Sequence, residues 1–228
     1  MKYIIVGLGN FGATLAEKLT SLGHEVIGVD VKMEKVEFLK EKVTHTICLD
    51  CTDRQAVSAL PLKDADIIMI CIGENEGANI MATALMKQLK VKRLISRSVS
   101  ALHEAVLEAM QVDEIIRPEE ETAERWANKL NLHGVVDSFE ITGDYSIVEV
   151  IVPDRFIGMT LEEADIRADY NLLVLTTIQF SEKKNILGLP KKITKVQGVA
   201  SAQTLLNHGD IMVLYGNIGD IKRLLKQD

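Results

Sequence analysis

The sequence is poor in cysteine, proline and aromatic residues, and it lacks long apolar runs. Its 228 residues include 3 Cys, 4 Pro and 4% aromatic residues. Cys48, Cys51 and Cys71 lack metal-ligand spacing and fall in or beside strand patterns, so we expect buried reduced thiols, as in a cytosolic protein. The longest apolar run, Ile67–Ile72, is far shorter than the roughly 20 residues that a membrane span requires.

Excess positive charge is also absent. The chain has 33 acidic and 26 basic residues, for a formal charge of −7. This balance argues against non-specific binding to nucleic acid. Met1-Lys2 leads directly into a strand pattern, which predicts no secretory signal peptide. With 47% apolar residues, the chain can form a core in one large or two small domains.

The N-terminal segment carries the most informative pattern. An apolar strand pattern over 3–6 leads into Gly7-x-Gly9-x-x-Gly12, then a helix pattern, then a strand pattern that ends on Asp30. Gly7 permits a tight turn, Gly9 lets the backbone approach phosphates, and Gly12 allows the helix to pack close to the strand. The helix N-terminus attracts the anion, and Asp30 is placed to accept hydrogen bonds from ribose hydroxyls. Together these parts predict a nucleotide site.

The first half of the chain alternates between strand and helix patterns. The first helix pattern has apolar residues at Phe11, Leu15, Leu19 and Leu22. Further strand patterns lie at 26–29, 46–49, 66–72, 93–96 and 114–116, and further helix patterns at 32–42, 53–60, 75–89 and 101–110. Six nearly continuous apolar strands separated by helices predict an α/β fold with a doubly wound parallel, Rossmann-like sheet over residues 1–117.

The second half of the chain no longer shows the regular alternation of strand and helix patterns. Pro118 opens a helix pattern at 119–132 with apolar residues on one face, so we expect 118–134 to be a connecting (crossover) helix that docks elsewhere. The patterns that follow are strands at 146–152, 172–180 and 211–215, a hairpin loop at 181–185, a capping box at Thr160 and Glu163, and a closing helix at 218–225. They predict a small α+β domain over 135–228, too short for a typical dehydrogenase substrate domain.

Two helix patterns of the first domain are more apolar than one buried face requires. Residues 80–89 are apolar nearly all round, and the next helix has an apolar stripe at 102, 105, 106, 109 and 110. The two explanations are an oligomer interface and a thick monomeric core. We favour the interface.

Polar and glycine residues follow the ends of several expected strands. They are Asp30 after the glycine motif, Asp50-Cys51-Thr52 after the third strand, Ile72-Gly73 after the fourth, Arg97 after the fifth, and Pro118-Glu119 before the connecting helix. With the small domain behind it, this set resembles the regulator of potassium conductance (RCK) family, the cytosolic Trk/Ktr-type subunits of bacterial potassium uptake systems. The resemblance covers essentially the whole chain. It implies a regulatory subunit, not an enzyme, that forms dimers and an octameric ring. Its implied partner is a membrane potassium-translocating subunit, so the ring would sit in the cytoplasm, peripheral to the inner face of the membrane.

The resemblance also implies a set of nucleotide-contacting residues. They are Gly7, Gly9, Asn10, Phe11 and Gly12 at the phosphates, Asp30 at the ribose, Asp50, Cys51 and Thr52 at the adenine or its ribose, Ile72 and Gly73 in a loop crossing the site, and Arg97 at a phosphate. Glu119 matches an acid that in some relatives helps hold a divalent cation. A surface ion pair is the alternative for Arg97, and an acid favoured near a helix N-terminus is the alternative for Glu119.

The identity of the ligand stays open at this level. ATP-responsive relatives often carry arginine after the second glycine, where this chain has Asn10, which cannot neutralise a triphosphate. NAD(H), ADP and ATP therefore all remain candidates, whereas the charge of Asp30 disfavours NADP. Ile166-Arg167-Ala168 loosely fits a stretch that binds a cyclic dinucleotide in some members, and a simple ion pair of Arg167 is the alternative.

The main alternative function is an NAD-dependent oxidoreductase. Hydride chemistry needs a positioned acid or base. None of the five histidines falls in a recognisable catalytic setting, and no Tyr-x-x-x-Lys pair occurs. A redox-sensing DNA regulator is a more distant alternative, because the chain is acidic. The resemblance therefore implies a gating subunit, in which nucleotide binding changes a ring that opens or closes a potassium translocator.

Overall fold

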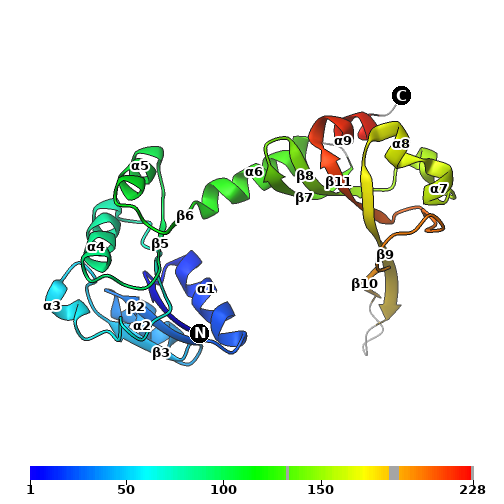
Figure 1. Cartoon of the computed structure of the whole chain (residues 1–228). Coiled ribbons are helices and arrows are strands. Elements are labelled where there is room, and N and C mark those ends of the chain that lie inside the picture. Colours follow the sequence, from blue (N-terminus) through cyan, green and yellow to red (C-terminus); the bar gives the residue numbers. More distant parts are fainter. Residues whose placement is uncertain (132–133, 185–189, 227–228) are drawn as a thin grey trace. The chain divides into compact units, whose positions relative to one another are not determined.

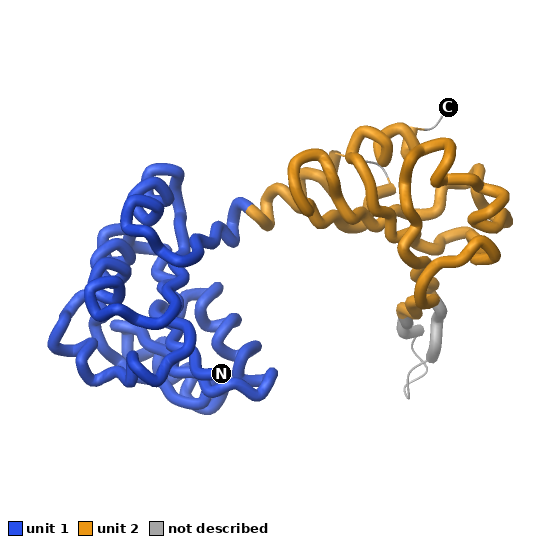
Figure 2. Tube along the Cα trace, in the orientation of Figure 1, with its two compact units in different colours: residues 1–120 blue, residues 121–228 orange. Residues whose placement is uncertain are grey.

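The computed structural model describes residues 1–131, 134–184 and 190–226 (Figure 1). The chain divides into two compact units, residues 1–120 and 121–228 (Figure 2). The division falls inside helix α6 (Pro118–Asn131), which therefore begins in the first unit and ends in the second. No helix of the described residues combines the length and the apolar character that crossing a bilayer demands.

The first unit contains the parallel sheet that the sequence predicts. Its strands are β1 (Lys2–Val6), β2 (Glu25–Asp30), β3 (His45–Cys48), β4 (Ile67–Ile70), β5 (Leu94–Arg97) and β6 (Glu114–Ile116). All five pairings are parallel, in the order β3-β2-β1-β4-β5-β6. The chain order reverses between β1 and β4, and ligands of such sheets bind beyond the carboxyl ends of the strands at this point.

Helices cover both faces of this sheet. They are α1 (Asn10–Ser21), α2 (Met33–Leu39), α3 (Arg54–Val57), α4 (Glu76–Gln88) and α5 (Ala101–Ala109). Alternate residues of β1 enter two separate cores, because Ile4 packs with buried residues of α3 and α4 and Ile5 packs with those of α1 and α2. Burial on both faces is the reason the strands are apolar without alternation.

One predicted apolar position of the first helix is wrong. Leu22 caps the C-terminus of α1 and is 71% exposed, whereas Leu15 and Leu19 pack on the core. The helix ends at Ser21 because Gly23, at φ +85°, turns the chain toward β2. The end of the helix removes Leu22 from the face that its spacing predicts.

The second unit has a five-stranded antiparallel sheet. Its strands are β7 (Val135–Thr142), β8 (Tyr145–Ile151), β9 (Leu173–Lys184), β10 (Pro190–Val196) and β11 (Ile211–Asn217), in the order β10-β9-β11-β8-β7. A 3₁₀ helix (Asp154–Phe156) and helices α7 (Leu161–Ala164), α8 (Ile166–Tyr170) and α9 (Ile218–Leu225) complete the unit. Its core joins residues of the central strands to those of α8 and α9. The predicted capping box opens α7, since Thr160 and Glu163 exchange hydrogen bonds of 3.2 and 2.8 Å.

The sequence misses the two edge strands of this sheet, β7 and β10. β10 carries mostly polar residues, and β7 alternates only near its end, where the apolar side chains of Phe139 and Ile141 are exposed; low burial is common where only one neighbour strand is present. The predicted hairpin loop at 181–185 is also wrong over 181–184, because β9 continues to Lys184 and pairs with β10 there. Asn185 lies outside the described residues.

Candidate nucleotide-binding site

The three motif glycines meet different surroundings at the end of β1. Gly7 has a φ of +95°, and an added Cβ there would lie 2.8 Å from the backbone nitrogen of Ile72. An added Cβ at Gly12 would overlap the carbonyl oxygen of Gly7. Gly9 has no neighbour within 4 Å of its Cβ position and an ordinary φ of −72°. The fold therefore requires glycine at Gly7 and Gly12, whereas at Gly9 it leaves open space.

The N-terminus of α1 lies beside this open space. The helix begins at Asn10, and its N-cap residue is Gly9, which has no side chain to accept a hydrogen bond from the first turn. The first turn also contains no acidic residue. Its N–H groups and the positive end of the helix dipole are thus suited to an anion such as a phosphate.

Asp30 supports the glycine turn from the end of β2. Its carboxylate is 8% exposed and accepts hydrogen bonds from the backbone N–H groups of Leu8, at 2.7 Å, and Lys32, at 2.8 Å. The sequence predicts a ribose-binding role for this residue but not this second role in holding Leu8. A carboxylate has about four lone-pair sites, so these two bonds leave acceptor capacity for a ribose hydroxyl.

The segment after β3 forms a tight turn. Asp50 accepts hydrogen bonds from the backbone N–H and the hydroxyl of Thr52, at 2.8 and 2.7 Å, and these bonds lower the pKa of the Asp50 carboxyl. Burial and, to a smaller extent, the negative charges of Asp50 and Asp30 together raise the pKa of the Cys51 thiol to about 12. The ends of β2 and β3 lie side by side, since Asp30 pairs with Cys48 in the sheet.

The three cysteines are free thiols with unequal burial. Cys51 and Cys71 are buried, as the sequence predicts, but Cys48 is only partly buried. Burial also raises the pKa of Cys71 to about 12. At pH 8 only about one in 10,000 thiols with such a pKa is ionised, and the thiolate is the reactive form.

Iodoacetamide at pH 8 should therefore modify the native chain once, at Cys48. Intact-mass and peptide spectra report the number and position of the adducts. The denatured chain is the control and should take up three. Rapid alkylation of Cys51 or Cys71 in the native chain would contradict the buried environment described for them.

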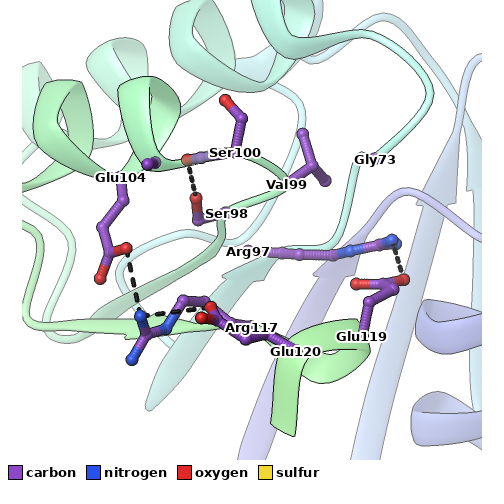
Figure 3. A pocket seen from close by; sticks show the side chains of 10 residues that line it. Gly73, Arg97, Ser98, Val99, Ser100, Glu104, Arg117, Glu119 and Glu120 are labelled. Atoms are coloured by element: carbon purple, nitrogen blue, oxygen red, sulfur yellow. Dashed lines mark hydrogen bonds and ion pairs between the residues drawn. The ribbon is translucent and has the colours of Figure 1, made fainter. Parts of the chain in front are cut away.

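Arg97 lies over Gly73, at the ends of β5 and β4 (Figure 3). An added Cβ at Gly73 would lie 2.6 Å from the guanidinium carbon of Arg97. The Arg97 side chain is 15% exposed and donates a hydrogen bond to the carboxylate of Glu119, on the first turn of α6. Its Nε is buried, and no hydrogen-bond partner for it lies among the described residues. The backbone of Ile72 lies close to Gly7, so the segment that leads to Gly73 packs beside the glycine turn.

Gly73→Ala should displace Arg97 and weaken phosphate binding. The new methyl group meets only the far end of a flexible side chain, so we expect the free energy of unfolding to change by less than about 1 kcal/mol. Nucleotide affinity, measured by calorimetry, should fall about tenfold with the loss of a charge-assisted contact. Gly77→Ala is the matched control, since its Cβ meets an atom at no less than 3.4 Å. Equal affinities for both variants would contradict the role given to Gly73.

A cavity of about 560 Å³ opens beside Arg97, with charges of both signs. Glu119, Glu104 and Glu120 lie on its walls with two arginines (Figure 3). Arg117 is 3.4 Å from Glu104 and 3.2 Å from Glu120. Across the described parts of the chain, no three His, Cys, Asp or Glu side chains lie close enough together to hold a metal ion. A cation at Glu119 would thus need oxygen atoms from a bound nucleotide or a second chain.

Known proteins resemble this chain over most of its length. The TrkA-N domain model matches residues 3–118, which include β1 to β6 and the site residues from Gly7 to Arg97. The chain belongs to the TrkA-N family. Two relatives are similar to the chain over both units. The Ktr system potassium uptake protein C of Bacillus subtilis is 29% identical over 99% of this chain and 96% of its own length. The Ktr system potassium uptake protein A of the same organism is 27% identical over 97% and 94%.

Solved structures share the fold of this TrkA-N chain. The structure described as the GsuK channel bound to NAD covers 99% of this chain with a TM-score of 0.66 and 18% sequence identity. This chain spans only 39% of that channel chain. The likeness confirms the predicted RCK fold, a Rossmann-like sheet followed by a small α+β domain.

The segment 166–168 lies in α8 of the second unit. Ile166 is buried in the core of that unit, whereas Arg167 and Ala168 are exposed. Only two of the three residues proposed for a cyclic dinucleotide are thus available at the surface.

Sequence reasoning misses one residue beneath the site. Asn79, on α4, is fully buried and donates hydrogen bonds to the carbonyl oxygens of Ile72 and Arg97. The signal for it is an asparagine directly before the mostly apolar stretch 80–86, but the sequence does not indicate what that side chain contacts.

Proposed function

We propose that this chain is the nucleotide-binding regulatory subunit of a potassium transport system. The observation that carries the proposal is the free space at Gly9, between the uncapped N-terminus of α1 and the buried Asp30. Gly7 and Gly12 have packing roles, whereas the space at Gly9 admits a phosphate. The family and the two Bacillus subtilis potassium uptake proteins that extend over the whole chain support a role in potassium transport.

Residues 1–117 form the proposed nucleotide domain, and the ligand is NAD(H), ADP or ATP. The phosphates lie against Gly9 and the backbone of Asn10 and Phe11, the ribose on Asp30, and the adenine near Asp50, Cys51 and Thr52. NAD in the GsuK channel, which shares this fold, supports a dinucleotide among the candidates. Asp30 disfavours NADP through repulsion of its 2′-phosphate.

Arg97 and Glu119 are the proposed switch. In the structure each is the other's partner, and Glu119 is on the first turn of α6. A phosphate that approaches Arg97 competes with this carboxylate. Once released, Glu119 is available to a divalent cation together with phosphate oxygens. The same helix is attached to β7 by the ion pair of Arg125 with Asp137, so a change at Glu119 acts on an element that both units share.

We further propose that the chain works in a ring, because nucleotide binding at one site supplies too little free energy to switch the conformation almost completely. A typical allosteric coupling is about 1–3 kcal/mol. Moving the equilibrium between two conformations from 1:99 to 99:1 requires a ligand whose binding free energies to the two differ by about 5.5 kcal/mol. Several coupled sites exceed this requirement. An octamer, built from dimers, agrees with the resemblance to RCK subunits.

Exposed apolar residues supply surfaces for this assembly. Leu102 on α5 is 78% exposed, and Met81 on α4 is also exposed. No residue of α6 is buried, and its Trp126 and Leu130 are exposed. These helices are the proposed contacts between copies. Residues 135–228 form the proposed second domain. A cyclic dinucleotide would bind there, at the exposed Arg167 and Ala168. The partner is a membrane potassium-translocating subunit, which places the ring in the cytoplasm against the membrane. No nucleic-acid partner and no enzymatic activity are proposed.

Calorimetry with ATP, ADP, NAD⁺ and NADH tests this function. At least one should bind wild-type protein reversibly, and chromatography should recover it unchanged. Asp30→Asn keeps the size of the side chain but replaces one acceptor oxygen with an NH2 group, so it loses capacity for the ribose and one of the two backbone hydrogen bonds, and it should weaken binding at least about tenfold. Absence of binding by all four would overturn the site, and turnover of NADH with a small substrate would favour the oxidoreductase.

A further inference from the structure

A closed cluster of buried polar side chains lies beneath the proposed site. Asn79, Thr83, Ser96 and His103 are each at most 1% exposed, on α4, β5 and α5. Burial of four polar side chains is costly unless they are hydrogen-bonded to one another. Their bonds converge on the amide of Asn79, and this amide faces the nucleotide site on its other side.

The donors of Asn79 connect two site segments. Its Nδ2 donates to the carbonyl oxygen of Ile72, at 2.8 Å, and to that of Arg97, at 3.1 Å. The ladder between β4 and β5 ends at the pair Ile70 and Ser96. Beyond that pair, the two hydrogen bonds of the Asn79 amide replace the backbone hydrogen bonds between the strands. They set the separation between the Ile72–Gly73 segment and Arg97.

The acceptor of Asn79 fixes the direction of the amide. Its Oδ1 is 3.0 Å from Ser96 Oγ and 3.2 Å from His103 Nε2. Thr83 Oγ1 lies 3.1 Å from Ser96 Oγ, which can accept its proton. An amide flipped by 180° would turn its N–H groups toward these donors and its oxygen toward two carbonyls. The cluster therefore allows one orientation.

This orientation also assigns the protonation of His103. An amide oxygen only accepts, so Nε2 carries the proton. Nδ1 is buried, and no hydrogen-bond partner for it lies within the described ranges. Burial lowers the pKa of His103, although the nearby charge of Glu76 opposes the shift. The contacts of the ring thus call for a single N–H, on Nε2, directed at Asn79.

We propose that Asn79 and His103 are positioning residues of the nucleotide site. They hold the Ile72–Gly73 segment and Arg97 at the separation at which the guanidinium meets phosphate. The inference rests on the proposed function. It adds that the affinity for phosphate, but not for the adenosine part of the ligand, depends on this buried cluster.

The test compares a phosphate-bearing ligand with adenosine, which has no phosphate. The phosphate-bearing probe is ADP or NAD⁺, whichever wild-type protein binds more tightly. Asn79→Leu and His103→Leu should each weaken binding of this probe about tenfold and leave adenosine binding unchanged. His103→Gln is the conservative control, since its amide can donate to Asn79, and it should retain affinity. Equal losses for both ligands, or none, would overturn the inference.

A double-mutant cycle separates positioning from general stability. In the Arg97→Gln background, Asn79→Leu should cause no further loss, because the group that it positions is already gone. Additive losses would show that the two residues act independently. If wild-type protein binds neither ADP nor NAD⁺, the proposed function fails. If wild-type protein and Asn79→Leu bind equally well, only the positioning role fails.

A measurement on wild-type protein keeps the inference testable even if the leucine variants do not fold. Nitrogen-15 spectra of the histidine rings distinguish the two neutral tautomers from the charged ring. His103 should show the Nε2–H tautomer at pH 7, with and without ligand. A proton on Nδ1, or a charged ring, would contradict the arrangement.

Discussion

Gly9→Ala should leave the fold intact and remove most of the affinity for nucleotide. The alanine methyl group enters empty space at an ordinary φ, so the midpoint of thermal unfolding should stay within a few degrees of the wild-type value. The same methyl group occupies the volume through which a phosphate reaches the N–H groups of α1. Overpacking of about 1–3 kcal/mol would weaken binding by about 5- to 150-fold. Calorimetry and a melting curve on the same sample measure both quantities.

Retained stability together with lost affinity in Gly9→Ala would show that Gly9 contacts the ligand and does not merely shape the turn. If Gly9 only shaped the turn, alanine would alter stability and binding together. Unchanged affinity for every adenine nucleotide would refute the placement of the phosphates at Gly9.

Gly12→Ala should have the opposite signature, a large loss of stability. The added Cβ would overlap the carbonyl oxygen of Gly7 and lie 3.1 Å from the Cβ of Cys71. Both neighbours belong to the packed centre of the first unit, so α1 must shift away from β1. We expect a destabilisation of about 3 kcal/mol, measured by urea unfolding. Gly9→Ala, three residues earlier in the same motif, is the matched control. A Gly12→Ala variant as stable as the wild type would contradict the close packing of α1 on β1.

The sequence predicts the first unit well because local signals agree there with tertiary structure. Strands such as Ile67–Ile70 are apolar throughout because helices cover both faces, and the glycine motif is confined to one turn. Edge strands such as Pro190–Val196 have no such pattern, since they need less burial.

The parts of the site that sequence reasoning misses are those made by distant segments. Asp30 is expected at a ribose, but its bond to Leu8 depends on how the end of β2 meets the glycine turn. Asn79 and His103 belong to different helices and meet only after both have packed on β5. Neither has a sequence spacing that indicates the contact. Tertiary packing, not local preference, creates these interactions.

The most direct test of the central claim is a crystal structure of the full chain with its tightest adenine nucleotide. The account predicts phosphate oxygens within hydrogen-bond distance of the backbone at Gly9 and of Arg97, and Glu119 separated from Arg97. A nucleotide bound elsewhere, with the pair of Arg97 and Glu119 intact, would contradict it.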